Sequence, residues 1–472
     1  MATIQSLGVG SGLDVNSIIS QLMAIERQPL QRMQQVAQGV QSQISLYGQV
    51  QSKVDALGTA AQALASSTRW RETTVNLNGA EAYTVTASAS AEPVSLEIEV
   101  HTLAQRQSVS TRAFDNASTT VGTGILSIQR GQWSENFGAF TPAPDATPIE
   151  IEIGAASSSL TGVRDAINAA DAGITASILT DAQGARLVLR STASGADQGF
   201  EITTLGGTDN FGALGFTAQT HPASSSGAQG NVRASDLTAT LNGASVQSDT
   251  NTLNNVLDGV SITALKTTSA PGTVTIARDT AAAKTRIQEF VTAYNDVTNF
   301  LKAQTAYNET TQTGAPLQGD RVALLIQNSL REVATDATGA SSVFSRLADI
   351  GITLQKGGAL SINEGTLDNA LQDVEEVAAL FSADNNDDAD DGLALRLASI
   401  VTQMTGSEGN LSAKRDSLQG RLRRNQDEQA RLEDRLVSVE SRLKAQYTAL
   451  DNKMASINGL AQYVAKQFSA AS

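Results

Sequence analysis

The last sixty or so residues constrain the fold most, because their apolar and amide side chains recur at alternating steps of three and four. An average step of 3.5 residues places these side chains on one stripe of a long helix. An apolar stripe of this length is unstable in water, so the segment must pack lengthwise against other helices. The stripe consists of Leu418, Leu422, Asn425, Gln429, Leu432, Leu436, Val439, Leu443, Gln446, Leu450, Ile457, Ala461, Val464 and Phe468. The pattern indicates a protein that works by assembling.

A second helical stripe lies near the N-terminus. Asp14 or Asn16 can cap the helix, and Pro29 is expected to kink or restart it. Roughly 50 helical residues at ~1.5 Å each would extend about 75 Å. The stripe consists of Ile18, Leu22, Ile25, Leu30, Met33, Val36, Val40, Ile44, Tyr47, Val54, Leu57, Ala61 and Leu64. Two long helices at opposite ends of one chain predict a single leg, with the residues between them carried as an insertion.

The C-terminal stripe has two interpretations: a coiled coil competent for assembly, or an internal helical bundle without self-association. Asn425, Gln429 and Gln446 favour assembly, because polar residues on a seam lower stability and tend to fix register or oligomer number. The internal bundle remains open. The residues predicted to carry assembly are Leu418, Leu422, Asn425, Gln429, Leu432, Leu436, Val439, Leu443, Leu450 and Ile457.

The middle of the chain is predicted to be β-rich. From Val94 to Val100 apolar and polar residues alternate, which indicates a half-buried strand. A similar strand at 149–153, a short helix near Thr161 and further strands up to 189 form a compact unit. Linker-like residues follow at 217–230. The predicted later elements are strands at 237–241, 260–265 and 274–276, helices after Asp279, Asp320 and Asn363, and a hairpin at Gly357-Gly358.

Composition excludes several classes of function. The chain has 472 residues, with 33 Lys+Arg against 48 Asp+Glu and a net charge of -15, so nucleic acid and anionic membrane are unlikely partners. No stretch approaches the ~20 apolar residues of a membrane span, and the N-terminus lacks the pattern of a Sec signal. Cysteine is absent, which excludes disulfides, thiolate nucleophiles and Cys-based metal sites.

The candidate catalytic and binding motifs all fail. Gly8, Gly10 and Gly12 lack the preceding strand and the spacing of a nucleotide-binding loop, so residues 1–12 are interpreted as flexible. His101 and His221 have no spaced partners, and Glu97 and Glu99 fit the solvated face of a strand. The acidic residues Asp384, Asp387, Asp388, Asp390 and Asp391 do not fit an EF-hand loop, because Ala389 and Ala398 fall at ligand positions. The sequence predicts no enzyme, no cofactor and no metal site.

A series of short motifs resembles the flagellar filament cap protein family, also called hook-associated protein 2. The N-terminal motif is Gly10-Ser-Gly12-Leu-Asp14, and the segment from Ile149 to about Glu201 resembles the flagellin hook IN motif. The ordered combination is specific and covers essentially the whole chain. The further motifs are Leu241-Asn-Gly243, Asp258-Gly259-Val260, Phe290-Val291, Ala293-Tyr294-Asn295, Gly319-Asp320, Ile350-Gly351-Ile352, Gly358-Ala-Leu360, Leu380-Phe381 and Gly392.

The resemblance implies a structural cap at the distal tip of the bacterial flagellar filament. Such a cap retains exported flagellin and promotes its folding and polymerisation, which filament elongation and motility require. It implies an extracellular protein, exported through the flagellar type III pathway with an export chaperone. The implied partners are a second copy in a ring-shaped homo-oligomer, usually a pentamer, then flagellin and the hook-filament junction proteins, without nucleic acid or membrane insertion.

The predicted architecture is α+β and multidomain, with long terminal coiled-coil helices forming a leg and nested β-rich head domains between them. An adhesin that binds host glycans or proteins through its β-rich domains is the alternative function. The predicted borders are 1–15 for a flexible N-terminus, 16–70 and 408–472 for the leg helices, 71–106 and 279–407 for a helical leg domain with a small sheet, 107–130 and 231–278 for a head domain, and 131–230 for an inserted head domain with the hook IN motif.

Overall fold

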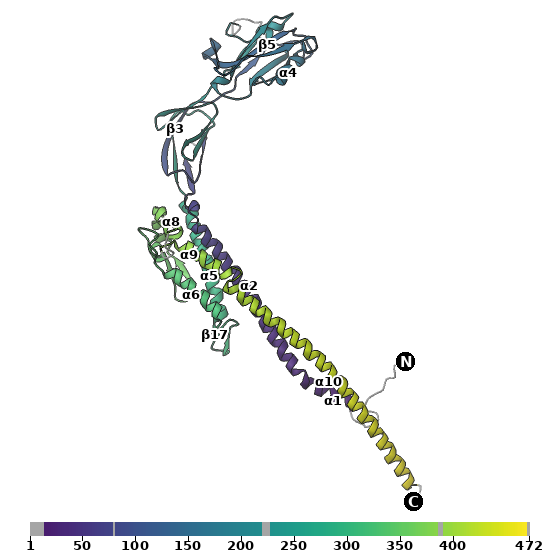
Figure 1. Ribbon diagram of the computed structural model, residues 1–472. Helices are drawn as coiled ribbons and strands as arrows, with labels where there is room; N and C mark the ends of the chain where they lie inside the picture. Colours follow the sequence, from purple (N-terminus) through teal and green to yellow (C-terminus); the bar gives the residue numbers. More distant parts are fainter. Residues whose placement is uncertain (1–13, 79–80, 220–226, 386–389, 470–472) are drawn as a thin grey trace. The chain divides into compact units, whose positions relative to one another are not determined.

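The chain forms two compact units, one nested in the sequence of the other. The computed structural model describes residues 14–78, 81–219, 227–385 and 390–469. One unit, here called the helical unit, contains residues 1–70 and 280–472, and the other, the β-rich unit, contains 71–279 (Figure 1). The predicted α+β multidomain architecture is confirmed, with long helices at both ends of the chain and antiparallel sheets between them.

Some of the predictions concern residues outside the described ranges. These are the flexible segment with Gly8, Gly10 and Gly12, the linker residue His221, and the acidic residues Asp387 and Asp388. They stay predictions.

The N-terminal helix is broken once, as Pro29 predicted. Helix α1 spans Val15–Glu26 and α2 spans Gln28–Ala65. The carboxylate of Asp14 accepts the Ser17 N–H at 3.0 Å and caps α1. Proline fits the first turn of a helix, where its missing N–H has no partner, but it is disfavoured in a helix interior. The chain therefore stops and restarts at Arg27.

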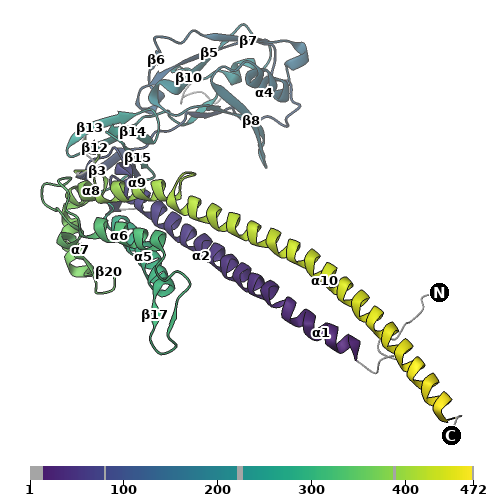
Figure 2. The same cartoon turned by 60° about the horizontal axis from the view of Figure 1, so that its bottom comes forward.

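The C-terminal helix α10, Asn410–Ser469, is the longest element of the chain at 60 residues. It lies beside α2 and then α1 in both views (Figures 1 and 2). Near its start the guanidinium of Arg415 donates to Gln51, and further along Glu440 forms an ion pair with Arg27 at 3.5 Å. Residue numbers increase along α10 while those of the contacting residues in α2 and α1 decrease, so α10 runs antiparallel to both helices.

Smaller helices complete the helical unit around one apolar core. The core includes Leu57, Leu64 and Phe381, and the ring of Trp70 stacks on Phe381 at 5.7 Å. The remaining elements are α3 (Ser67–Trp70), α5 (Thr280–Thr305), β17 (Tyr307–Asn308), β18 (Thr313–Gly314), α6 (Arg321–Thr335), β19 (Ile352–Leu354), β20 (Leu360–Ile362), α7 (Glu364–Ala370), α8 (Val374–Ser382) and α9 (Leu393–Thr405).

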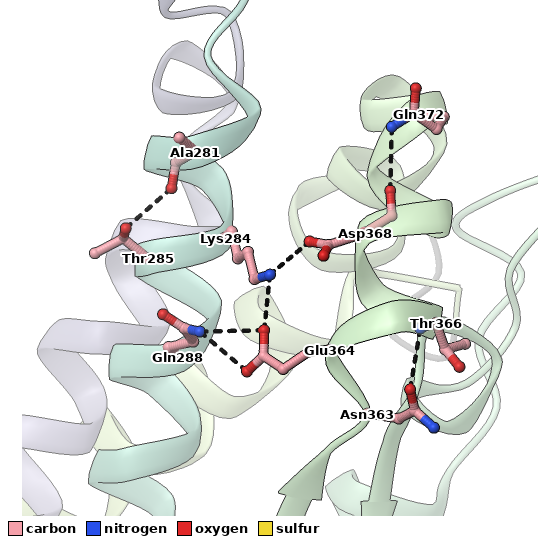
Figure 3. Close-up of polar contacts among 9 residues, drawn as sticks. All are labelled: Ala281, Lys284, Thr285, Gln288, Asn363, Glu364, Thr366, Asp368 and Gln372. Carbon is pink, nitrogen blue, oxygen red and sulfur yellow. Dashed lines mark hydrogen bonds and ion pairs between the residues drawn. The ribbon is translucent and has the colours of Figure 1, made fainter.

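The helix predicted after Asn363 is present, and the structure divides it into two helices. Asn363 caps α7 by accepting the N–H of Thr366 at 3.1 Å, and the hairpin of β19 and β20 precedes it as expected. However, a 3-10 turn at Leu371–Asp373 separates α7 from α8. Between α5 and α7, Lys284 of α5 reaches both Glu364 and Asp368, at 2.7 and 2.5 Å (Figure 3). These ion pairs join α7 to α5.

The β-rich unit contains two separate apolar cores. The first β domain packs a five-stranded sheet of order β1-β16-β3-β12-β13 against a three-stranded sheet of order β14-β15-β2. The predicted inward face of β3 is confirmed, because Leu96, Ile98 and Val100 are buried. The strands are β1 (Thr73–Leu77), β2 (Tyr83–Ala87), β3 (Val94–Thr102), β12 (Leu237–Leu241), β13 (Ala244–Ser248), β14 (Thr252–Leu257), β15 (Val260–Ala264) and β16 (Gly272–Arg278).

The second β domain consists of helix α4 (Leu160–Ala169) and two four-stranded sheets. One sheet has the order β11-β4-β9-β8, and in the other β5 pairs with β10, β6 and β7. Trp133 anchors the core, with the Phe216 ring at 5.1 Å. The strands are β4 (Ser108–Ser110), β5 (Gly124–Trp133), β6 (Phe140–Pro142), β7 (Ile149–Ile153), β8 (Ile174–Asp181), β9 (Gly184–Ser191), β10 (Gly199–Leu205) and β11 (Gln229–Val232).

The strands are grouped differently from the predicted borders. Residues 71–106 were expected beside 279–407, but β1, β2 and β3 pair with β16, β15 and β12. Residues 107–130 were expected beside 231–278, but β5 pairs with β7 and β10, which come from 131–230. The alternating pattern of a strand shows which face is buried and does not show which strand is its neighbour.

Candidate assembly surface

The N-terminal part of the predicted seam, at the start of α10, belongs to the core of the helical unit. Leu418 is buried there and Leu422 packs against the same core. One turn before Leu418, the ammonium of Lys414 lies 2.7 Å from Asp320, and the hydroxyl of Tyr47 donates to the same carboxylate at 2.5 Å. This polar cluster therefore ties the start of α10 to α2 and to the N-terminus of α6.

The charge state of Asp320 is set by its neighbours. Burial alone would raise its pKa, but the Lys414 ammonium, the Tyr47 hydroxyl and the N–H of Val322 together hold the pKa of Asp320 below its usual value. Burial and the hydrogen bond to Asp320 raise the pKa of Tyr47. The carboxylate stays ionised and the phenol stays neutral at pH 7, so the cluster keeps its attractive charges. The sequence predicted Asp320 as a cap but offered no signal for Lys414 or for the hydroxyl of Tyr47.

The middle part of the seam packs against α1. Leu436 is 5% exposed, and Leu432, Val439 and Leu443 are half-buried around it. Tyr447 extends this cluster in place of the predicted Gln446, which is exposed. The middle of the predicted seam is thus an intramolecular contact.

The prediction identified the wrong face of α1 as the one that packs against α10. Ile25 is 62% exposed and Leu22 is 36% exposed, whereas the side chains that pack against α10 are Val15, Ile19 and Met23. The two sets lie on neighbouring faces of a helix that is apolar around much of its circumference, so periodicity alone did not identify the buried face. The spacing of four residues between Val15, Ile19 and Met23 was the sequence pattern that could have identified the buried face.

The amides divide the seam. Asn425 and Gln429 are half-buried, and the Gln429 amide donates to Asn425 at 2.5 Å along the same helix. They lie between the core that ends at Leu422 and the α1 cluster that begins at Leu432. In α2 the residues 31–39 are mostly polar or small, and Val36 among them is exposed. The amides therefore pair within α10, and the apolar packing of the rod is interrupted there.

The last part of the seam faces solvent. We call Leu450, Ile457, Leu460 and Val464 the distal stripe, and their exposed fractions are 43%, 58%, 65% and 43%. Helix α1 begins at Val15, and its apolar cluster with α10 includes no residue of α10 beyond Tyr447, so within the described ranges no side chain of the distal stripe belongs to an apolar core. Exposed side chains of this size at helical spacing indicate a surface for another helix.

The other candidate residues lie apart from any common site. His101 and Glu97 are exposed on β3, and Asp384 and Asp391 flank the partly described acidic loop. Within the described ranges, no group of three or more His, Asp or Glu side chains is placed to hold a metal ion. No described helix combines the length and the apolar character that crossing a bilayer requires.

Family models match most of the chain. The model for the N-terminus of flagellar hook-associated protein 2 matches residues 11–107, and the model for its C-terminus matches residues 234–459. The model for the flagellin hook IN motif matches residues 144–193, which include β7, α4, β8 and β9. The predicted resemblance to this motif is confirmed for residues 149–193, and the match does not extend to the predicted end near Glu201.

Characterised relatives and a crystal structure agree with the family models. Flagellar hook-associated protein 2 of Escherichia coli K12 is 31% identical over 482 residues, covering 99% of this chain and 98% of the relative. The B-type protein of Pseudomonas aeruginosa is 30% identical, covering 94% and 93%. The crystal structure of the D1-D2-D3 domains of the flagellar cap protein FliD from E. coli, 30% identical, covers 79% of this chain and 99% of its own, with a TM-score of 0.57.

A helical unit with an uncovered stripe, an inserted β-rich unit and these relatives define a structural protein of the bacterial flagellum. The chain belongs to the flagellar hook-associated protein 2 family. This is a family of structural cap proteins and not a known family of enzymes. The relatives lend no support to the adhesin alternative.

Proposed function

We propose that this chain caps the distal end of the bacterial flagellar filament, where it retains exported flagellin and promotes its folding and polymerisation. The observation that carries the proposal is the distal stripe of α10, which ends the helical unit with four large apolar side chains in water. A helical segment of an arriving subunit is a suitable partner for it, because an amphipathic helix binds such a surface through apolar residues at matching spacing.

The interrupted rod suits a cap that must hold on and move. Each leucine or isoleucine of the distal stripe gains about 1.5–3 kcal/mol when it is fully buried. A binding free energy shared among a few such contacts is large enough to retain a subunit and small enough to allow its release. The amide pair Asn425 and Gln429 limits apolar packing between the anchored and free parts of α10. The free part can then adjust its position while the core of the helical unit stays folded.

The proposal includes the following partners and location. The chain assembles with further copies of itself into a ring, a pentamer by family resemblance, and contacts flagellin and the hook-filament junction proteins. It leaves the cell by the flagellar type III pathway, accompanied by an export chaperone, and acts outside the cell at the filament tip. The absence of cysteine fits a chain that crosses an export channel unfolded.

The test is complementation of a strain that lacks the chain with the Leu450→Asp/Ile457→Asp variant. Both side chains are exposed in the isolated chain, so the variant folds normally, whereas each carboxylate would be buried on binding and abolish the apolar gain. We expect folded, exported protein, unpolymerised flagellin in the medium and short or absent filaments.

The control is Val437→Asp, which changes a more exposed apolar residue, 68% exposed, on the other side of α10. Filament length and swimming should be normal in the control. Filaments of normal length in the Leu450→Asp/Ile457→Asp strain would refute the role of the distal stripe.

A further inference from the structure

The β-rich unit has two basic side chains without a partner, and they lie together. Among its lysines and arginines, Arg106 and Arg190 are the two whose charged groups make no hydrogen bond, ion pair or ring contact with any described residue. The others all have such a contact: Arg71, Arg112, Arg130, Arg164, Arg186, Arg233, Lys266 and Arg278.

Both arginines line one groove of about 800 Å³ on the outer face of the β11-β4-β9-β8 sheet. Arg190 lies in the middle of this face, because it pairs with Ser108 of β4 on one side and with Thr175 of β8 on the other. These short hydroxyl side chains leave the guanidinium open and add hydrogen-bond donors. None of the described residues that line the groove is acidic.

Arg106 and Arg190 occupy neighbouring positions on the two paired strands. The N–H of Ser191 donates to the carbonyl of Gln107 at 3.1 Å, so the pairing of β4 with β9 continues toward Arg106. Arg106 then lies two residues before Ser108 and is the diagonal neighbour of Arg190. Diagonal neighbours of an antiparallel pair are roughly 7–8 Å apart.

The same domain carries an acidic strand on its other sheet. Glu150 and Glu152 project from the outer face of β7, while Ile151 and Ile153 turn inward to the core. Among the described strands β7 pairs with β5 alone, so it is an edge strand there, and Glu201 of β10 lies on the same outer face. Alternate residues of a strand are about 6.6 Å apart, which is close to the spacing of the two arginines.

We propose that the second β domain is a head-to-tail connector, in which the Arg106–Arg190 groove of one copy receives the Glu150–Glu152 strand of a second copy. The inference rests on the ring assembly proposed above and names the surfaces that form it. Charge complementarity selects the occupant: two carboxylates at strand spacing meet two guanidinium groups that have no partner in their own chain. Arginine suits this contact because its planar guanidinium binds a carboxylate through paired hydrogen bonds.

The geometry explains why such a contact leads to a ring and not to a dimer. The groove and the strand belong to different sheets of one domain, and the inner faces of both sheets contribute to one core, so the two surfaces face away from it. A copy bound through its groove therefore still offers its own acidic strand. Contacts between unlike surfaces generate rings when the rotation closes and open filaments when it does not.

The test is charge reversal in the full-length chain, followed by mass photometry and sedimentation velocity at low and high salt. Arg106→Glu/Arg190→Glu and Glu150→Arg/Glu152→Arg should each lower the association constant at least tenfold. An equimolar mixture of the two variants should recover association, because each reversed surface then meets an opposite charge. The chain carrying all four substitutions should recover it as well. Association of the wild type should weaken with salt.

The matched control is Arg164→Glu/Lys266→Glu, which changes the net charge equally at a half-buried and an exposed side chain outside both surfaces. Circular dichroism of every variant checks folding. The contact is refuted if the Arg106→Glu/Arg190→Glu variant associates as the control does, if mixing restores nothing, or if the wild type remains monomeric. These results leave the motility test of the distal stripe unaffected, so failure of the connector and failure of the cap function are distinguishable.

Discussion

Asp320 shows at the scale of one residue how the helical unit is held together. Its carboxylate caps α6 through the N–H of Val322 at 2.9 Å, accepts the hydroxyl of Tyr47 and pairs with Lys414. The side chain is only 12% exposed, so these contacts are poorly screened by solvent. One acidic group therefore connects three helices that are far apart in the sequence.

Asp320→Asn should destabilise the helical unit by about 1–3 kcal/mol, because the amide keeps the cap but leaves the Lys414 ammonium without its counter-charge. Urea unfolding followed by circular dichroism measures the change. Asp416→Asn, at an exposed position of α10, is the control and should have little effect. Equal stability of the two variants would show that the cluster contributes nothing.

The pH dependence of this cluster has a defined sign. The pKa of Asp320 is lowered in the folded chain, so the unfolded chain binds the proton more readily. The contribution of Asp320 is complete above its ordinary pKa near 3.8 and is lost as the pH falls through the lower, folded value. The stability difference between wild type and Asp320→Asn should therefore be present at pH 7 and shrink on acidification below about pH 4. An unchanged difference down to pH 2 would contradict this account.

Two substitutions in α1 separate the buried face from the one that the sequence predicted. Met23→Asp places a charge at a position that is 3% exposed against α10, and should detach α1. Ile25→Asp changes a side chain that is 62% exposed and should leave the fold intact. Hydrogen exchange of the α1 amides distinguishes them, with protection lost in the first variant and kept in the second. The reverse result would restore the predicted stripe.

At the scale of the element, α10 has an anchored part, an amide interruption, a part covered by α1 and an uncovered end. Replacing both amides, Asn425→Leu/Gln429→Leu, should join the two apolar clusters and raise the free energy of unfolding of the helical unit by about 1–3 kcal/mol. Filament growth should slow, because the free part of α10 loses its freedom to adjust.

The control for the amide variant is Gln426→Leu/Ala430→Leu, which adds similar apolar side chains at exposed positions of the same two turns. Thermal unfolding and filament length are measured for both. A more stable amide variant with filaments of normal length would show that the interruption is unrelated to filament growth.

Sequence periodicity predicted the elements well and their partners less well. Strands β3, β7, β8 and β9, the caps Asp14, Asp320 and Asn363 and the break at Pro29 depend on local chemistry, and all were found. The 3-10 turn after Ala370 was missed, because no proline or glycine marks it. The grouping of strands was missed because pairing joins residues far apart, such as Thr102 and Thr238, and no local signal encodes it.

The same limit applies to the candidate site. The stripe from Leu418 to Leu443 was placed correctly on one face of one helix, and its heptad spacing sufficed for that. The end of its intramolecular cover near Tyr447 depends on where α1 begins in space. Exposure of Leu450 and Ile457 is therefore a tertiary property that the pattern does not contain.

At the scale of the whole molecule, the two units have separate cores and should fail separately. Leu436→Asp/Leu443→Asp should disrupt the packing of α10 on α1 and abolish filament growth, while the β-rich unit stays folded. Scanning calorimetry should show the transition of the β-rich unit unchanged and that of the helical unit lowered. Normal motility of this variant would refute the importance of the rod.

The antiparallel pairing of α2 with α10 also fixes when the chain can fold. Arg415 contacts Gln51 across 364 residues of sequence, so the rod cannot close until the C-terminal helix is present. A chain that is being synthesised, or threaded through a channel from its N-terminus, carries α2 without its partner until the end. Isolated helices are marginal in water. Because α10 emerges after α2, the two helices can pair only once α10 is available. Until then α2 has no partner helix, and the rod forms after the chain has passed through.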